Sequence, residues 1–176
     1  RCLVGSEMCI RDSKECLLSS TYEPSSKTKM KLRAAPGAGT MYLQSECAEA
    51  LAELFAGAEE AGYKLYLKSA YRAYKTQKTM YNNRLERNNG KDDGWVSKPG
   101  ASDHQTGLGC DVVPGSWKDK SMNSNMASTP ECQWMAEHCY EYGFVIRYPE
   151  DKQDITEINY EPWHLRYVGK EVARYI

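Results

Sequence analysis

Residues 102–111 read SDHQTGLGCD. The run from Gly107 to Val113, closed by Pro114, predicts a strand, with His104 just before it and Asp111 on it. His104 and Asp111 are seven positions apart, which is not a ligand spacing on a helix. The intervening glycines indicate a turn that brings both side chains to one metal ion. Alone, such a pair is weak evidence for a metal site.

A second segment lies about fifty residues later, where residues 161–164 read EPWH. We predict that the stretch from Glu161 to Tyr167 is a strand. Glu161 and His164 are three positions apart, so on an extended strand their side chains point to opposite faces unless a bulge or the Pro162 kink intervenes. We therefore expect the backbone to be distorted here.

Together the two segments offer three zinc ligands, His104, Asp111 and His164, and one further carboxylate, Glu161, to activate a water. A catalytic zinc ion has three protein ligands and an open fourth position, whereas a structural zinc is usually enclosed by four Cys or His side chains. A single His beside carboxylates is more often a surface or packed residue, but the conjunction of both segments is much rarer. The pattern predicts hydrolysis rather than a zinc finger.

Two other side chains of ligand type are interpreted as structural. His138 has no partner at ligand spacing. Cys110 directly precedes Asp111 on the predicted strand, so its side chain points to the opposite face, into the core.

The periodicity of apolar residues predicts three helices and four strands, with Ser45 capping the first helix and Gly143 ending the third. We expect the class α+β, with a small, mainly antiparallel sheet, flanking helices and the zinc site in a central cleft. The helices are predicted at 45–62, 75–87 and 130–142, the strands at 63–70, 107–113, 144–148 and 161–167, and a last helix starts at 169.

The N-terminal part reads differently from the rest. Residues 1–13 show no periodicity, and 5–13 look like a translated sequencing-adapter string, so we leave 1–13 out of the fold prediction. Residues 14–40 are rich in Ser, Lys, Pro and Gly, which predicts an extended arm with at most one short strand. We therefore expect an N-terminal arm over 1–40 and a single domain over 41–176.

The composition of the chain disfavours some classes of binding partner. The chain has 176 residues, a formal net charge of -1 and a sequence pI near 6.4, so it has no overall basic field to hold nucleic acid or an anionic membrane. It also lacks a run of about eighteen apolar residues that could span a bilayer. The seven cysteines include no Cys-x-x-Cys pair, which disfavours a cysteine zinc knuckle. We interpret the cysteines as buried free thiols, with a disulfide in an oxidising compartment as the alternative.

Several motifs also follow one another in a fixed order. The motifs are SAYR at 69–72, Gln77, S-x-H-x-x-G-x-x-x-D over 102–111, YGFVIRYP at 142–149 and EPWHLRYVG at 161–169. With these motifs, the chain from about Met41 to Ile176 resembles the VanY-type zinc D-alanyl-D-alanine carboxypeptidases, a family that includes the LdcB-type L,D-carboxypeptidases.

The resemblance implies a role for each matching residue. His104, Asp111 and His164 bind one Zn²⁺ ion, and Glu161 is the general base. Arg72 stabilises the oxyanion or holds the substrate carboxylate. The side chains expected to contact the terminal residue of the substrate, or to wall its pocket, are Gln77, Ser102, Tyr148 and Trp163.

The chain departs from the family pattern at two places. Asp103 stands where Glu is common, and Gly109-Cys110 replaces the usual small and apolar residues before Asp111. We also expect two segments without a family match, 88–100 and 115–129, to border the cleft.

The activity implied is removal of the C-terminal D-alanine from bacterial peptidoglycan stem peptides or their precursors, by a monomer outside the cytoplasm, although no signal peptide is visible. Whether it is a D,D- or an L,D-carboxypeptidase stays open. The alternatives are an endolysin-type L-Ala-D-Glu peptidase, which needs room beyond the leaving residue, and a catalytically inactive cell-wall binding module. Arg72 and Gln77 disfavour the first, and Glu161 disfavours the second.

Overall fold

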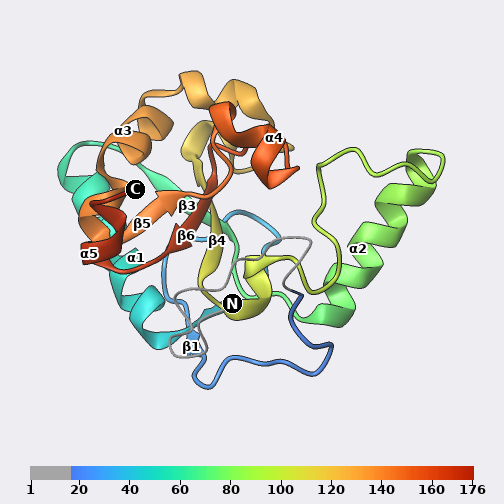
Figure 1. The fold of residues 1–176 in the computed structure, drawn as a ribbon. Helices are drawn as coiled ribbons and strands as arrows, with labels where there is room; N and C mark the ends of the chain where they lie inside the picture. Colours follow the sequence, from blue (N-terminus) through green and yellow to red (C-terminus); the bar gives the residue numbers. More distant parts are fainter. Residues whose placement is uncertain (1–16) are drawn as a thin grey trace.

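The computed structural model describes residues 17–176, so the predictions for residues 1–13 lie outside the described residues. At its centre is a four-stranded sheet in the order β3-β4-β6-β5, in which every neighbouring pair is antiparallel (Figure 1). The predicted α+β class with a small antiparallel sheet is confirmed. The strands are β3 (Leu65–Ser69), β4 (Gly109–Pro114), β5 (Phe144–Ile146) and β6 (His164–Tyr167).

The pairing of the two central strands brings the two sequence segments together. In the register of β4 and β6, Asp111 lies opposite His164, and Gly109 lies opposite Arg166. Cys110, between these two positions, is fully buried in the apolar core, as predicted. The paired strands therefore bring Asp111 and His164 together, while the side chain of Cys110 lies in the core.

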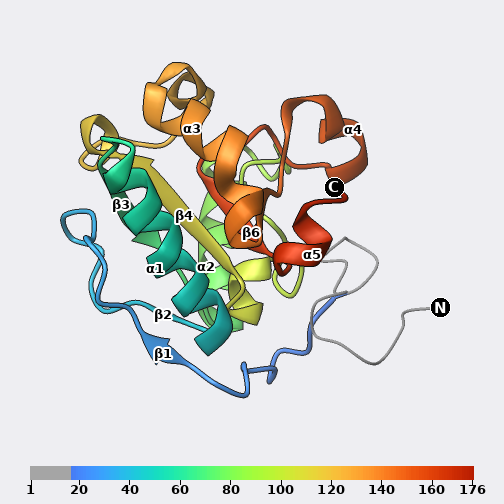
Figure 2. The ribbon, with the colours of Figure 1, turned by 90° about the vertical axis from the view of Figure 1, so that its left-hand side faces the viewer.

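Helix α1 (Ser45–Glu60) covers the core face of the sheet with an apolar stripe. Helix α2 (Tyr74–Arg87) lies on the opposite side, as Figures 1 and 2 show together. The predicted cap of α1 is wrong by one residue, because Gln44 occupies the N-cap position without a side-chain bond and the hydroxyl of Ser45 lies 2.9 Å from that of Thr28. The buried residues of α1 are Cys47, Ala48, Ala50, Leu51, Leu54, Phe55 and Ala58.

The predicted third helix is divided in two. Helix α3 (Pro130–His138) begins after Thr129, whose hydroxyl accepts the amide of Cys132, and a 3₁₀ helix (Cys139–Tyr142) continues it. Gly143 then ends the helical segment with φ = 85°, as predicted. The segment after β5, for which no helix or strand was predicted, contains a 3₁₀ turn (Glu150–Lys152) and the short helix α4 (Gln153–Thr156).

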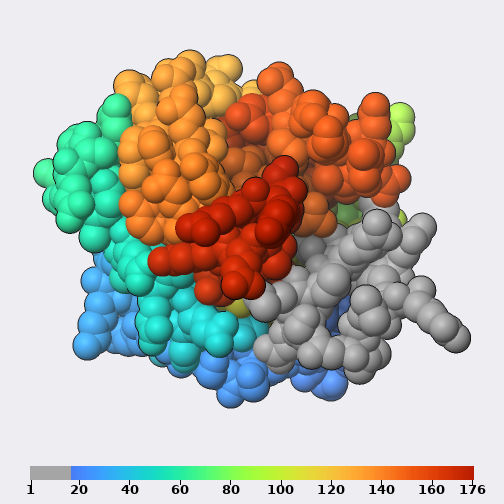
Figure 3. Space-filling view, turned by 60° about the vertical axis from the view of Figure 1, so that its left-hand side comes forward, coloured from blue at the N-terminus to red at the C-terminus, as the bar shows by residue number. Residues whose placement is uncertain are grey.

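The C-terminal segment closes the core side of the molecule. Helix α5 (Lys170–Ala173) lies on the surface between the segments of α1 and α3 (Figure 3), where Lys170 pairs with Glu53 of α1 at 2.8 Å. Four cysteines in the described part of the chain are free and buried, which confirms the interpretation as core thiols for Cys47, Cys110, Cys132 and Cys139.

The N-terminal segment from residue 17 to 40 follows the surface in an extended course. Its strand β1 (Thr28–Lys29) pairs with β2 (Tyr42–Leu43). Further along, Ala34 forms a parallel bridge to Leu67 on the edge strand β3, which covers part of an otherwise open sheet edge. Within residues 17–176, no helix has the length and apolar character needed to cross a membrane.

Candidate active site

A pocket of about 190 Å³ opens between β4, β6 and α2, on the side of the sheet that carries Asp111 and His164. It collects side chains from distant parts of the sequence, including every residue that sequence analysis assigned to the site. These nine residues are Arg72, Gln77, Ser102, His104, Asp111, Tyr148, Glu161, Trp163 and His164. Their individual roles stay predictions, whereas their convergence is a property of the fold.

Local backbone features place the first pair of candidate ligands. His104 lies on a 3₁₀ helix (Asp103–Thr106) that ends at Gly107, whose φ of 72° is in the left-handed region open to glycine. The chain then turns into β4, which carries Asp111. The turn predicted between the two side chains is therefore present, and Gly107 is the residue that makes it.

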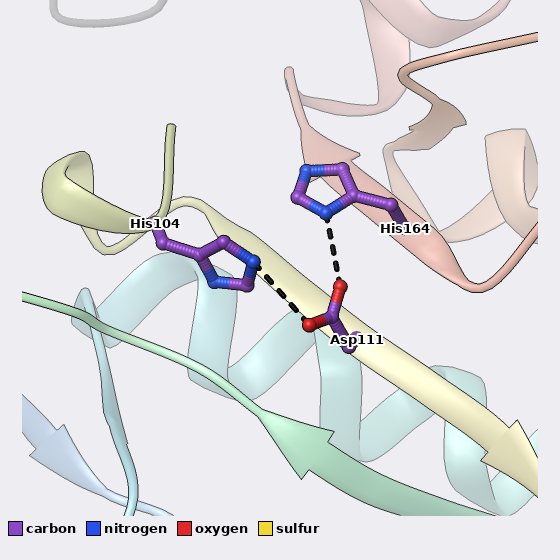
Figure 4. Close-up of side chains that lie close together, drawn as sticks. All are labelled: His104, Asp111 and His164. Carbon is purple, nitrogen blue, oxygen red and sulfur yellow. Dashed lines mark hydrogen bonds and ion pairs between the residues drawn. The ribbon is translucent and has the colours of Figure 1, made fainter. Parts of the chain in front are cut away.

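The three candidate ligands form a tight group (Figure 4). Nε2 of His104 lies 3.4 Å from Oδ2 of Asp111, and Nδ1 of His164 lies 3.0 Å from Oδ1 of the same carboxylate. One ligand atom from each residue lies within 4.8 Å of the other two, and all three side chains are buried. This group could hold a metal ion.

The outer nitrogens of both imidazoles are already engaged. Nδ1 of His104 donates to the carbonyl of Ala70 at 2.7 Å, which leaves Nε2 facing Asp111. Nε2 of His164 donates to Oδ1 of Asp103 at 2.8 Å, which leaves Nδ1 facing Asp111. Such outer partners orient the histidine ligands of metal sites. Two nitrogens and a carboxylate aimed at one point fit the donor set of a catalytic zinc site.

The charges of the group support the same assignment. Burial lowers the pKa of His104, assisted by the nearby Arg72, so the neutral imidazole with a free Nε2 lone pair is favoured. Burial alone raises the pKa of Asp111, but the two histidines outweigh it and hold that pKa well below its usual range. An acceptor nitrogen facing a carboxylate at 3.4 Å is the arrangement that a cation between them satisfies.

Glu161 does not lie on a strand, which corrects the predicted range 161–167. It begins a turn in which the amide of His164 donates to the carbonyl of Glu161 at 3.1 Å, and β6 starts only at His164. The predicted distortion near Pro162 is therefore a complete turn. It brings Oε2 of Glu161 to 3.7 Å from Nδ1 of His164. Burial raises the pKa of Glu161 to about 8.

Arg72 presents its guanidinium to the same pocket from the segment after β3. Its Nη1 donates to Oε1 of Gln77 at 2.8 Å, its Nη2 donates to Oγ of Ser69 at 3.0 Å, and Nη2 lies 3.9 Å from Oδ2 of Asp111. Two neutral acceptors thus fix the plane of the guanidinium. The guanidinium group therefore lies directly beside the candidate metal ligands.

The pocket wall also includes residues that the sequence motifs did not single out. They come from α2 and from the two segments expected to border the cleft, 88–100 and 115–129. These residues are Met80, Trp95, Val96, Ser97 and Met122. A salt bridge between Arg84 and Asp93 anchors the first of these segments, and the side chain of Asn159 donates to the carbonyl of Asp93 at 2.8 Å.

Asp103 is the most notable omission. Its side chain is fully buried beside His164, whereas the sequence indicates only that Asp stands where Glu is common in the family. Its position one residue before His104 was the available signal, but an aspartate next to a predicted ligand does not reveal which histidine it contacts.

An antiparallel sheet that presents two histidines and an aspartate in a buried pocket defines the class as an α+β protein with a candidate metal centre. Comparison with known proteins gives the family. The profile of the VanY family, described as D-alanyl-D-alanine carboxypeptidase, matches residues 40–170, and the chain belongs to this family.

Two curated relatives show the extent of the similarity. YodJ of Bacillus subtilis (strain 168) is 38% identical over 167 residues, which cover 93% of this chain and 61% of the relative. A D-alanyl-D-alanine carboxypeptidase of Enterococcus faecium is 35% identical over 130 residues, which cover 73% of this chain and 38% of the relative. The chain therefore spans less than two thirds of the length of either protein.

Two solved structures share the fold. The LdcB LD-carboxypeptidase superposes with a TM-score of 0.88 at 37% identity, covering 96% of this chain and 80% of that one. The vancomycin-resistance D,D-pentapeptidase VanY from a VanB-type cassette, solved as a mutant with Zn(II), gives a TM-score of 0.73 at 26% identity, covering 95% of this chain and 91% of that one.

Proposed function

We propose that this protein is a zinc-dependent carboxypeptidase that removes the C-terminal D-alanine from peptidoglycan stem peptides or their precursors. The observation that carries the proposal is the convergence, in one pocket, of the His104, Asp111 and His164 group with Glu161 and Arg72. The similarity to a D,D-pentapeptidase solved with Zn(II) supports the choice of metal.

The three-residue group holds one zinc ion. When bound, zinc supplies a Lewis acid that polarises the scissile carbonyl and lowers the pKa of water. Glu161 takes a proton from the attacking water and delivers it to the departing amine. Its position supports this role, because the Glu161 carboxylate lies at the edge of the metal-ligand group without joining a strong ion pair.

Arg72 recognises the substrate. A carboxypeptidase binds a free α-carboxylate, and a guanidinium offers several donors in a fixed plane. Arg72 is held in place by Gln77 and Ser69, so it either binds that carboxylate or stabilises the oxyanion. Because both groups of the Gln77 amide are already bonded within the protein, we propose that Gln77 acts by holding Arg72.

The remaining predicted residues shape the pocket. Ser102, Tyr148 and Trp163 are all buried at its wall, and the ring of Tyr148 lies 5.0 Å from that of His164. We propose that they contact the terminal residue of the peptide. Because peptidoglycan and its exported precursors lie in the cell envelope, the proposed location is outside the cytoplasm.

Two kinds of peptide are candidate substrates. LdcB is an LD-carboxypeptidase and VanY is a D,D-pentapeptidase. In this protein the proposed metal ion and base could serve either bond. The greater similarity to LdcB makes the tetrapeptide, whose D-alanine follows an L-centre, the first substrate to test.

The test combines metal analysis with the release of D-alanine from stem tetrapeptide and pentapeptide. One zinc ion per chain and release from at least one peptide are expected, with activity lost on chelation and restored by zinc. Cleavage between L-Ala and D-Glu instead would identify an endopeptidase. Peptide binding without any release would identify a binding module, and either result would overturn the proposal.

A further inference from the structure

Asp103 makes one short contact with the candidate metal site. Its Oδ1 accepts a hydrogen bond from Nε2 of His164 at 2.8 Å, and its side chain has no exposed surface. Its Oδ2 lies 3.8 Å from Nη1 of Arg166, too far for a hydrogen bond, and has no hydrogen-bond partner among the described residues. The carboxylate is therefore held in the core chiefly by the ring of His164.

Gly109 provides the space for this carboxylate. A Cβ placed at Gly109 would lie 2.6 Å from both Cγ and Oδ1 of Asp103, which is shorter than any tolerable contact. Gly109 lies two positions before Asp111 on the same face of β4, so its missing side chain opens a gap directly beside the ligand group. With any larger residue at this position, the carboxylate of Asp103 or the backbone of β4 would have to shift.

We propose that Asp103 is a positioning residue for the zinc site and that the absence of a side chain at Gly109 is what allows it to act. By accepting the Nε2 proton of His164, Asp103 fixes the ring orientation and leaves Nδ1 directed at Asp111 and His104. A hydrogen-bonded carboxylate behind a histidine ligand also makes that ligand a better donor. The inference rests on the proposed zinc site and adds two residues that do not touch the metal.

The experiment measures zinc affinity by competition with a chromophoric chelator at one fixed pH. Asp103→Asn removes the charge of the acceptor, and Gly109→Ala keeps the charge but displaces the carboxylate. Both variants should bind zinc about 10- to 100-fold more weakly than the wild type, the usual loss for an outer partner of a ligand. In the zinc-loaded protein, ¹⁵N spectra should show His164 protonated at Nε2 in the wild type and an altered ring signal in both variants.

Cys110→Ala is the matched control. It lies between Gly109 and Asp111 and is fully buried, but its side chain points into the core, so it reports any general loss of stability in β4. It should bind zinc as the wild type does. If Asp103→Asn fails to fold because Arg166 loses a neighbouring charge, the zinc affinity of Gly109→Ala tests the proposal without it.

The outcomes separate the two proposals. Wild-type zinc binding that is unchanged in both Asp103→Asn and Gly109→Ala would overturn the role of Asp103 and leave the proposed function intact. Failure of the wild type to bind zinc would overturn the proposed function and this inference with it.

Discussion

The guanidinium of Arg72 donates to the amide oxygen of Gln77 at 2.8 Å, and the amide nitrogen of Gln77 donates to the carbonyl of Ser97 at 2.6 Å. Only 1% of Gln77 is exposed. One amide therefore joins the proposed substrate-binding cation to the segment that forms the pocket wall. A change in Gln77 should disturb both at once.

Replacing Gln77 with Ala should lower kcat/KM about 10- to 100-fold, because hydrogen bonds to charged groups contribute about 1.5–3 kcal/mol. Steady-state kinetics of D-alanine release would measure the loss. Thr79→Ala is the control, since Thr79 is exposed on the same helix and bonds only to the carbonyl of Lys75. Equal activity of Gln77→Ala and wild type would show that Arg72 keeps its position unaided.

Replacing Glu161 with Gln should preserve zinc binding and reduce kcat by about 10²- to 10⁴-fold, the range for loss of a positioned general base. Glutamine has nearly the same shape, so the turn from Glu161 to His164 should persist. The measurement pairs metal content with D-alanine release for the same preparation. A variant that turns over like the wild type would exclude Glu161 as the base.

We expect Glu161→Gln also to change how the stability of the metal-free protein depends on pH. Burial raises the pKa of Glu161 from 4.5 to about 8, so between these values the folded chain keeps a proton that the unfolded chain loses. The stabilising contribution is complete below the lower value and is lost as pH rises through the upper one. The slope is at most about 1.4 kcal/mol per pH unit.

Urea unfolding of wild type and Glu161→Gln, both with chelator, should therefore give free energies of unfolding whose difference shifts in favour of the variant as pH rises across this window. Because other titrating groups are common to both proteins, they largely cancel in the difference. A constant difference would contradict the raised pKa of Glu161.

Zinc affinity should increase with pH. Burial opposes protonation of His164, but Asp103 and Asp111 outweigh it and raise the pKa of His164 well above its ordinary value, so its Nδ1 carries a proton in the metal-free protein. Below that raised pKa, zinc must displace the proton, and affinity should rise about tenfold per pH unit for one proton released. Calorimetric titration in two buffers of different ionisation enthalpy would count the proton. A flat affinity would contradict the prediction.

Gly107→Ala should destabilise the protein by about 1–3 kcal/mol, because the turn requires φ = 72° and the added Cβ would lie 3.2 Å from Cγ of Pro24. Gly39→Ala is the matched control, since Gly39 has φ = 68° but an added Cβ would meet nothing within 4 Å. The difference between their free energies of unfolding isolates the steric part. Equal decreases in the free energy of unfolding would mean that the neighbours of Gly107 can shift at no cost to make room for the added Cβ.

Much of the fold could be predicted from the sequence, because the periodicity of apolar residues and the positions of glycines determine local secondary structure. Helix α2 and the end of the helical segment at Gly143 were predicted to within a residue. The strand predicted to start at Glu161 was wrong there, because Glu161 and Pro162 lie in a turn despite the strand-like sequence pattern. The partners of Gln77 and Asp103 were beyond prediction, because Ser97 and His164 reach them only through the folded chain.

The turn from Glu161 to His164 affects which positions can be substituted during evolution. Glu161, the proposed general base, and His164, a proposed metal ligand, lie within four consecutive residues, so one local backbone shape sets their spacing. The pocket wall, in contrast, comes from separate segments such as 95–97 and Met122. Substitutions there can alter which peptide enters while the reacting centre keeps its dimensions.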